Sequence, residues 1–328
     1  MADELTLLVA KWINSDVDDT RGFRGLKAKI DFLTEVLYNE YLPTKAGGHG
    51  EFRYRLTKWI RSATDEDQKK LMFLLINHLF FIGQKEMEAL YLTAYSCHVA
   101  KWLLRKNNIQ LDDPQAEELL KQAFAKTLFT GITDSLRLGD FIRMNEIQGH
   151  PIRFCWEQGL TDWNPVNFVA SMGNRTKIVL LEDFVGSGSQ MEDAVREACA
   201  LAQHYEVLLC PLVICPEGAK LANQLTAAHP NLSFSPALQL EPSSFVGKIA
   251  NAEEPALFAE LRQLVVDLHP AVTGTTPWVQ NHGPYGYRDT GGLIVKHDNC
   301  PDNTIPMIHH ASNTPWTPLF LRTSREPL

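Results

Sequence analysis

Residues 178–189 have the sequence IVLLEDFVGSGS, and this stretch decides the fold class. Its four leading apolar residues predict a strand that is buried on both faces, as in a parallel sheet. Beyond the loop, Met191, Ala194, Val195 and Ala198 recur at helical spacing. The order of strand, acidic pair, small-residue loop and helix therefore predicts an α/β domain with a mainly parallel sheet.

The loop after the acidic pair has the composition of a phosphate site. Residues 186–189 are Gly-Ser-Gly-Ser, so little side-chain bulk separates an anion from the backbone N–H groups at the helix start. Glu182 and Asp183 come shortly before this loop, separated from it by two apolar residues, and carboxylates accept the hydrogen bonds that vicinal sugar hydroxyls donate. Phosphate at one end and hydroxyls at the other predict a ribose 5-phosphate ligand.

Two other nucleotide-binding motifs match the spacing of this stretch less well, and a junction without a ligand is a further alternative. A Walker loop needs a lysine after its second glycine, and none follows Gly188. A dinucleotide fingerprint needs a third glycine where Met191 stands, and it does not explain the paired acids. An ordinary junction of strand, turn and helix, with Ser189 as the helix cap, needs no ligand and stays open.

Composition sets broad limits on function. The chain has 328 residues, which is long enough for two domains, and its 45% hydrophobic and 21% charged residues are typical of a soluble globular protein. The formal net charge of −8 argues against a wide basic surface for nucleic acid. A local basic cleft is still compatible with this charge, so a nucleic acid could be an acceptor or partner.

The sequence also predicts a cytoplasmic protein without a membrane partner. The longest apolar stretch, residues 71–82, is interrupted by Asn77 and His78 and is too short to span a bilayer. The acidic N-terminus lacks the features of a signal peptide. Six cysteines are scattered without CxxC spacing, which favours free thiols in a reducing compartment. The histidines at 297, 309 and 310 fit no standard zinc pattern.

Two domains are expected along the chain. Residues 1–125 have helical spacing and predict a helical bundle, with Thr64 as the N-cap of a helix over 65–82 and a further helix over 85–106. His98 on the second helix is expected to be a hydrogen-bonded core residue.

Residues 126–328 predict the α/β domain, which ends in a tail rich in Pro and Asn from about 271 to 328. Pro211 is unexpected inside a strand because it lacks a donor for the ladder. Strands are expected at 177–181, 206–215 and 233–238, and helices at 189–204, 218–229 and 254–269.

The stretch 182–189 resembles the phosphoribosyl pyrophosphate signature of type I phosphoribosyltransferases. That signature is an apolar strand, two acids, two apolar residues and four small residues. Phe184 and Val185 are the two apolar residues here. Gly186 stands where these enzymes usually have Thr, and Gln190 stands where another Ser or Thr is common. These departures remove a hydroxyl donor and keep the backbone donors.

Three stretches carry a wider resemblance that covers most of the chain. They are Gly131-Ile132-Thr133-Asp134 followed by Arg137, Asp140 and Arg143; residues 181–188; and the tail segments 283–286, 297–306 and 316–322. Together they resemble the phosphoribosyltransferase-like family of bacterial conflict elements (PRTase-CE). The resemblance implies a type I phosphoribosyltransferase-like domain and a toxin-like effector in an anti-phage defence system, which in some members is linked to a retron.

The resemblance also implies an enzyme that binds phosphoribosyl pyrophosphate or a related ribose phosphate, with Mg²⁺, and that transfers or cleaves at ribose C1. Glu182 and Asp183 would be its catalytic residues, and no residue is assigned as a metal ligand. The implied substrate-binding residues are Phe184, Val185, Gly186, Ser187, Gly188, Ser189, Gln190, Asp134, Arg137, Arg143, His297, Asn303 and Arg322.

Alternatives stay open for the outer residues and for the activity. Arg137 and Arg143 could clamp pyrophosphate, since guanidinium offers paired donors, or they could form surface ion pairs. The tail residues could form a hood over the sugar site, or they could fix irregular backbone. The chain could also sense a ribose phosphate without turnover and control a partner protein from the same operon through its helical part.

Overall fold

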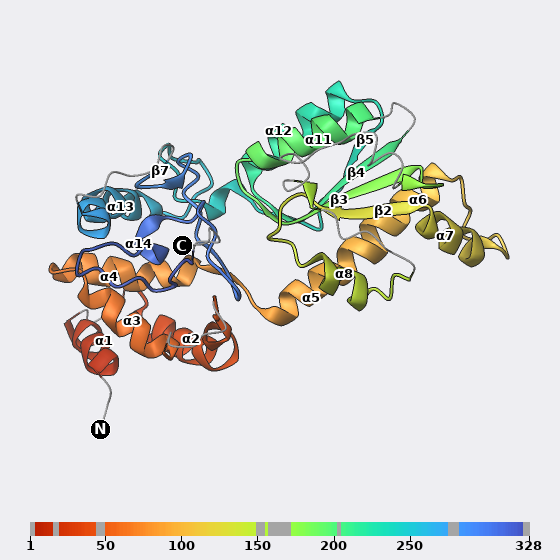
Figure 1. Ribbon diagram of the computed structural model, residues 1–328. Helices are drawn as coiled ribbons and strands as arrows, with labels where there is room; N and C mark the ends of the chain where they lie inside the picture. The colour runs from red at the N-terminus through yellow and green to blue at the C-terminus, as the bar shows by residue number, and fades with distance from the viewer. Residues whose placement is uncertain are drawn as a thin grey trace. The chain divides into compact units, whose positions relative to one another are not determined.

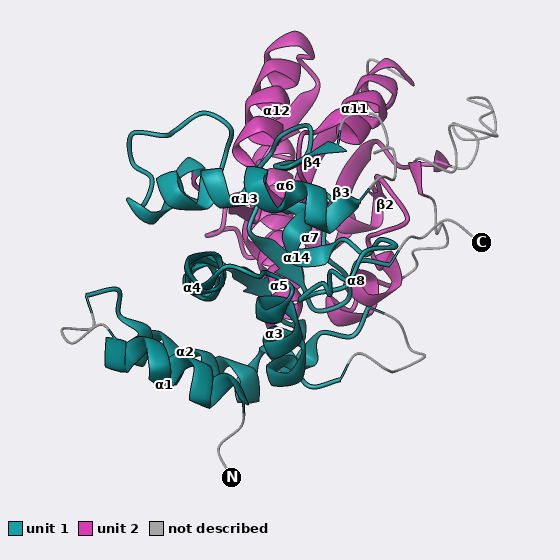
Figure 2. Cartoon of the chain, turned by 90° about the vertical axis from the view of Figure 1, so that its left-hand side faces the viewer, with its two compact units in different colours: residues 1–84, 242–328 teal, residues 85–241 magenta. Residues whose placement is uncertain are grey.

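The computed structural model describes residues 4–15, 20–43, 50–148, 155–156, 172–201, 205–274 and 282–323. The chain forms two compact units (Figures 1 and 2). Unit 1 combines Met1–Gln84 with Pro242–Leu328, and unit 2 is Lys85–Glu241. This division differs from the expected boundary near residue 125, because the chain leaves unit 1, forms unit 2 and then returns.

Unit 2 contains a parallel sheet with the strand order β2-β3-β4-β5, and the short β6 pairs with the end of β4. The mainly parallel α/β fold expected from the sequence is thus confirmed. The register places Gly131 beside Leu181, and Glu182 beside Pro211. The strands are β2 (Thr127–Gly131), β3 (Lys177–Val185), β4 (Glu206–Ile214), β5 (Leu232–Phe234) and β6 (Leu238–Gln239).

Helices cover both faces of this sheet (Figure 1). On one face, α11 and α12 bury small apolar residues such as Ala194 and Ala222 against Leu180. On the other, Tyr95 stacks on Phe124 with ring centroids 4.5 Å apart, and both rings lie near Phe129 of β2. The helices are α5 (Gln84–Thr93), the π-helical segment η3 (Ala94–Val99), α6 (Ala100–Lys106), α7 (Ala116–Ala125), α8 (Leu138–Met144), α11 (Ser189–Leu201) and α12 (Pro216–Ala228).

The expected helix over 85–106 is present as α5, η3 and α6 in succession. Its polar side chains reach the edge of the sheet. His98 Nδ1 lies 2.8 Å from Ser235 Oγ, and Trp102 Nε1 donates to Ser233 Oγ at 3.1 Å. His98 is therefore a hydrogen-bonded residue of the helix–sheet contact, as expected.

Pro211 is accommodated because β5 and β6 are separate strands. The N–H and C=O of a strand residue point to the same side, and the Pro211 carbonyl accepts the N–H of Ala237 at 2.9 Å. The missing donor of Pro211 therefore faces residues 235–237, between the end of β5 and the start of β6. Pairing between β3 and β4 resumes beyond it, with Phe184 beside Val213 and Val185 beside Ile214.

Unit 1 joins the two ends of the chain in one hydrophobic core. β1 pairs in parallel with β9, with Phe80 beside Ile294. Its first part contains α1 (Glu4–Ser15), α2 (Phe23–Val36), η1 (Tyr38–Glu40), α3 (Phe52–Arg61), α4 (Glu66–Leu75), η2 (Ile76–His78) and β1 (Phe80–Ile82). Its second part contains η4 (Pro242–Ser244), α13 (Leu257–Thr273), β7 (His282–Gly283), β8 (Gly286–Tyr287), β9 (Ile294–Lys296) and α14 (Pro306–His309).

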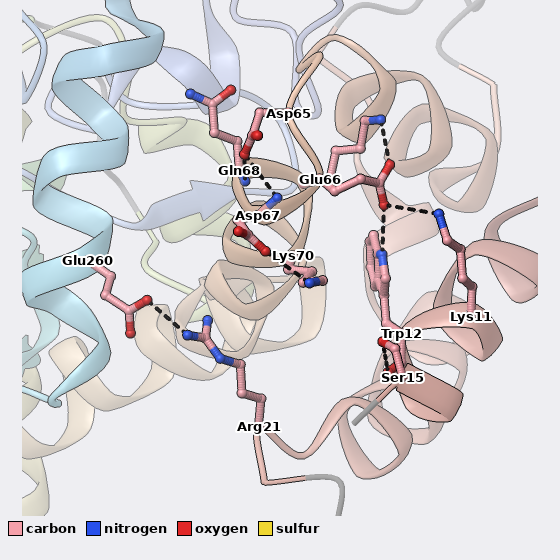
Figure 3. Close-up of polar contacts among 11 residues, drawn as sticks. Lys11, Trp12, Ser15, Arg21, Asp65, Glu66, Asp67, Gln68, Lys70 and Glu260 are labelled. Atoms are coloured by element: carbon pink, nitrogen blue, oxygen red, sulfur yellow. Dashed lines mark hydrogen bonds and ion pairs between the residues drawn. The ribbon is translucent and has the colours of Figure 1, made fainter. Parts of the chain in front are cut away.

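Two expectations for the N-terminal part are wrong. The helix expected over 65–82 ends at Leu75, because the last apolar residues of that run form β1 instead. The N-cap is Asp65 rather than Thr64: the Asp65 carboxylate accepts the N–H groups of Asp67 at 3.0 Å and Gln68 at 2.9 Å (Figure 3). Its extended backbone, with φ −82° and ψ 139°, places the carboxylate over the first turn.

The C-terminal tail is part of this core. The buried Arg55 guanidinium donates to Leu319 O at 2.8 Å, Tyr41 Oη donates to Leu321 O at 2.6 Å, and Trp59 Nε1 donates to Met307 O at 2.6 Å. In the part of the chain that the structure describes, no helix has the length and apolar character needed to cross a membrane.

A fragment of residues 85–241 is expected to fold alone, whereas a fragment of residues 126–328 is expected to aggregate. The first contains the whole of unit 2. The second lacks Tyr95 and Phe124, which cover Phe129, and has only half of the core of unit 1. Circular dichroism and size-exclusion chromatography would test this, and a monomeric, cooperatively unfolding 126–328 fragment would contradict the observed division.

Candidate functional site

The candidate site lies at the carboxyl ends of β2 and β3. Because these strands are parallel neighbours, the loop after Gly131 and the loop after Val185 lie at the same edge of the sheet. The loop after β2 contacts β3 at once, since the Ile132 N–H donates to Leu181 O at 2.9 Å. In open α/β sheets, ligands bind outside the carboxyl ends of the strands.

Glu182 and Asp183 lie inside β3 rather than beyond it, and each is only 4% exposed. Glu182 Oε2 accepts the Thr133 N–H at 2.8 Å, and Glu182 Oε1 lies 2.5 Å from Thr133 Oγ1 and 2.6 Å from Ser135 Oγ. Asp183 Oδ1 lies 2.6 Å from Ser135 Oγ and accepts the Phe184 N–H at 2.8 Å. The loop after β2 thus supplies the donors that allow two carboxyl groups to be buried.

Burial is the main cause of an altered acidity at Glu182. Burial first, and then the charge of Asp183, raise the pKa of the Glu182 carboxyl from its ordinary value of 4.5 to about 8, while the hydrogen bonds from Ser135 and Thr133 act in the opposite direction. This raised pKa favours the protonated form of the Glu182 carboxyl near neutral pH. A strongly shifted carboxyl at a sheet edge is characteristic of functional sites.

The small-residue loop leads directly into α11. Gly188 has φ +85°, a conformation that favours glycine, and α11 begins at Ser189. Ser189 is thus the first helical residue and not the residue before the helix. A Cβ on Gly218 of α12 would meet Gly186 O at 2.7 Å, so glycine at 218 permits this loop to pack closely on the next helix. Ser187 Oγ and Ser189 Oγ lie 3.4 Å apart.

The remaining residues of this stretch differ in their exposure. Val185 is buried, Phe184 is half-buried and Gln190 is exposed at the start of α11. Val185 belongs to the apolar core between the sheet and α11. Of these three residues, Phe184 and Gln190 have side-chain surface that a ligand could contact.

The structure brings only some of the other predicted residues to this edge. Asp134 and Arg137 are exposed in the same loop as Thr133 and Ser135, just before α8. Arg143 lies at the other end of α8, where it is 78% exposed and pairs with Asp140 at 3.4 Å. Arg143 is therefore accounted for by a surface ion pair of the kind that contributes little to stability.

His297, Asn303 and Arg322 belong to unit 1, and each has contacts there. The His297 N–H donates to Ile82 O at 2.8 Å, and Asn303 Nδ2 donates to Thr290 Oγ1 at 2.9 Å. Arg322 Nη1 donates to Cys300 O at 2.8 Å. These bonds hold the irregular backbone of the tail within unit 1.

A family model described as PRTase-CE matches residues 56–322. The chain belongs to the PRTase-CE family. No curated protein and no solved structure matches it. The matched range includes both the acidic pair in unit 2 and the tail in unit 1, so the PRTase-CE region spans both compact units.

The sequence did not identify Thr133 and Ser135 of this PRTase-CE protein as site residues. Both carry hydroxyl groups and follow the end of β2 directly, in a segment that was noted only for its resemblance to the family. The sequence pattern that could have indicated them is a pair of hydroxyl residues at alternate positions after a parallel strand. A loop at that place lies beside the acidic residues near the end of the neighbouring strand.

The carboxyl groups described here do not form a metal cage by themselves. Among the described residues there is no group of three or more His, Cys, Asp or Glu side chains that could hold a metal ion. Mg²⁺ commonly binds through substrate phosphates together with one or two carboxylates, so its binding to this chain would depend on the phosphates of a ligand.

Proposed function

We propose that this PRTase-CE protein is an enzyme that binds phosphoribosyl pyrophosphate or a related ribose phosphate and transfers or cleaves at C1 of the ribose. The observation that carries the proposal is the buried acidic pair at the end of β3, followed at once by the small-residue loop at the start of α11. Acceptors for sugar hydroxyls and donors for a phosphate are thereby only a few residues apart.

The roles of the residues follow from this placement. Glu182 and Asp183 accept hydrogen bonds from the 2- and 3-hydroxyls, and residues 186–189 hold the 5-phosphate. The negative charge of Asp183 stabilises the positive charge that develops on the ribose ring as the C1 bond breaks. Arg137, exposed in the loop after β2, would contact pyrophosphate through its paired donors. Mg²⁺, when bound, supplies charge neutralisation for the leaving pyrophosphate.

The biological role that we propose is that of a cytoplasmic effector in anti-phage defence, in a system that could include a retron. This part rests on the family alone. A protein encoded beside it would be the partner, and the helices of unit 1 offer a surface for contact with such a protein.

One observation supports a second candidate function, a ribose-phosphate sensor without turnover. The oxygens of Glu182 and Oδ1 of Asp183 already accept bonds from Thr133, Ser135 and Phe184, so the pair is held in a closed arrangement. A ligand that displaced these bonds would move the loop after β2, and that movement could signal to a partner.

Pyrophosphate release distinguishes the two functions. The full chain would be incubated with phosphoribosyl pyrophosphate labelled in the ribose, Mg²⁺ and a cell extract, and both released pyrophosphate and labelled products would be measured. Release together with a labelled acceptor is expected for the enzyme. Binding in calorimetry without release would support the sensor, and the absence of both would contradict the two proposals.

A further inference from the structure

The contacts around Glu182 involve more short oxygen pairs than the hydroxyl protons can serve. Thr133 Oγ1, Ser135 Oγ, Glu182 Oε1 and Asp183 Oδ1 make four contacts of 2.5–2.7 Å with one another. A hydroxyl has one proton to donate, so Thr133 and Ser135 together can serve two of these contacts. If Glu182 and Asp183 were both ionised, two of the four contacts would bring oxygen lone pairs together without a proton between them. One proton on the carboxyl pair supplies a third hydrogen bond.

None of the described groups that act on the Glu182 carboxyl carries a positive charge. The groups that act on the Glu182 carboxyl are Asp183 on its own strand and Thr133 and Ser135 on the loop after β2. Its neighbour on β4 is Pro211, which does not titrate and has no N–H. A proton that Glu182 shares with its hydrogen-bonded neighbours therefore allows its carboxyl to be buried beside Asp183.

We propose that Thr133 and Ser135 are positioning residues of the Glu182–Asp183 pair. Their hydroxyls bind the carboxyl oxygens to which ribose hydroxyls would otherwise bind, and they share one proton with the pair. The inference rests on the proposed function in that the ligand is a ribose phosphate. Two ribose hydroxyls replace the two loop hydroxyls, the loop over residues 132–137 moves away, and the proton leaves to solvent as both carboxylates become acceptors. Ligand affinity then rises with pH.

Ser135→Ala tests this directly. In the free protein the variant removes a hydroxyl that competes with the ligand, so ribose 5-phosphate should bind about 3- to 10-fold more tightly above the titration range, the equivalent of one hydrogen bond. The variant also removes a bond that favours the ionised carboxyl, so the pH at which affinity rises should shift upward. Calorimetry in two buffers with different ionisation enthalpies should give about one proton released per ligand in the wild type at neutral pH.

Two controls separate positioning from a structural role. Ser96→Ala removes an exposed hydroxyl of the same unit, which donates to Leu92 O at 2.6 Å and lies 3.7 Å from Cys97 Sγ, and it should change neither affinity nor pH dependence. Thr133→Val preserves shape and keeps the backbone bond from residue 133 to Glu182, and it should act in the same direction as Ser135→Ala. Weaker binding by Ser135→Ala with an unshifted pH profile would overturn the inference.

A measurement without ligand keeps the inference separate from the proposed function. Infrared difference spectra of wild type against Glu182→Gln should contain the carbonyl band of a protonated carboxyl at about pH 6, and Ser135→Ala should move its titration to higher pH. Absence of this band would overturn the inference whatever the ligand data show. A band that shifts as expected, in a protein that binds no ribose phosphate, would support the proton-sharing role of the loop and overturn the proposed function.

Discussion

Asp183→Asn is expected to weaken binding of ribose 5-phosphate by about 100-fold and to abolish pyrophosphate release. The amide keeps the size of the side chain and can still accept the Phe184 N–H, so the fold should be intact. It removes the charge that strengthens hydrogen bonds from ribose hydroxyls, and a bond to a charged group contributes about 1.5–3 kcal/mol. It also removes the negative charge that, in the proposed reaction, stabilises the positive ribose ring.

The matched control is Asp193→Asn, which removes one carboxylate from an exposed position on α11. It changes the net charge by the same amount and should bind ribose 5-phosphate as the wild type does. Calorimetry of the three proteins, with circular dichroism to verify the fold, would be decisive. Wild-type affinity in a folded Asp183→Asn protein would exclude the acidic pair as the ribose site.

Glu182→Gln is expected to remove a marked pH dependence of stability. Burial and the Asp183 charge raise the pKa of Glu182 in the folded protein from 4.5 to about 8. Between pH 4.5 and about pH 8 the unfolded chain has released the Glu182 proton, whereas the folded protein still holds it. The contribution of this proton to the free energy of unfolding is therefore complete below pH 4.5 and is lost as the pH rises toward 8. The free energy of unfolding of the wild type, relative to Glu182→Gln, should fall by about 1.4 kcal/mol per pH unit within this window.

Urea unfolding of both proteins across this pH range would measure the slope. Glu217→Gln on α12 changes an exposed glutamate of the same unit, and its slope should match that of the wild type. A wild-type slope equal to that of Glu182→Gln would mean that Glu182 is ionised in the folded protein. The shared proton would then be excluded.

The elements around the site could be predicted because their signals are local. The apolar run 178–181 and the helical spacing after Ser189 are set by residues close in sequence, and β3 and α11 form where these signals lie. The end of β3 could not be predicted, since acidic residues disfavour a buried strand unless donors reach them. Those donors come from Thr133 and Ser135, about fifty residues earlier in the chain, and no local pattern reveals such a contact.

The division of the chain into units 1 and 2 could not be predicted from the sequence for a related reason. Phe80, Phe81 and Ile82 continue an apolar run without a period, so a short strand there resembles the end of a buried helix. Their partner is a strand more than two hundred residues later, Ile294–Lys296. The predicted boundary at 125 followed the change from helical to alternating patterns, which marks where strands begin and not where a core is completed.

The return of the chain to unit 1 determines the order in which a growing polypeptide can acquire structure on the ribosome. The N-terminal helices emerge first, but β1 finds its parallel partner, and Arg55 its carbonyl acceptor at Leu319, only after the segment from residue 242 onward has been made. At about 5–20 residues per second, synthesis of the intervening 157 residues (85 to 241) takes roughly 8–30 s. The Lys85–Glu241 segment can therefore fold while the first helices still lack the other half of their core.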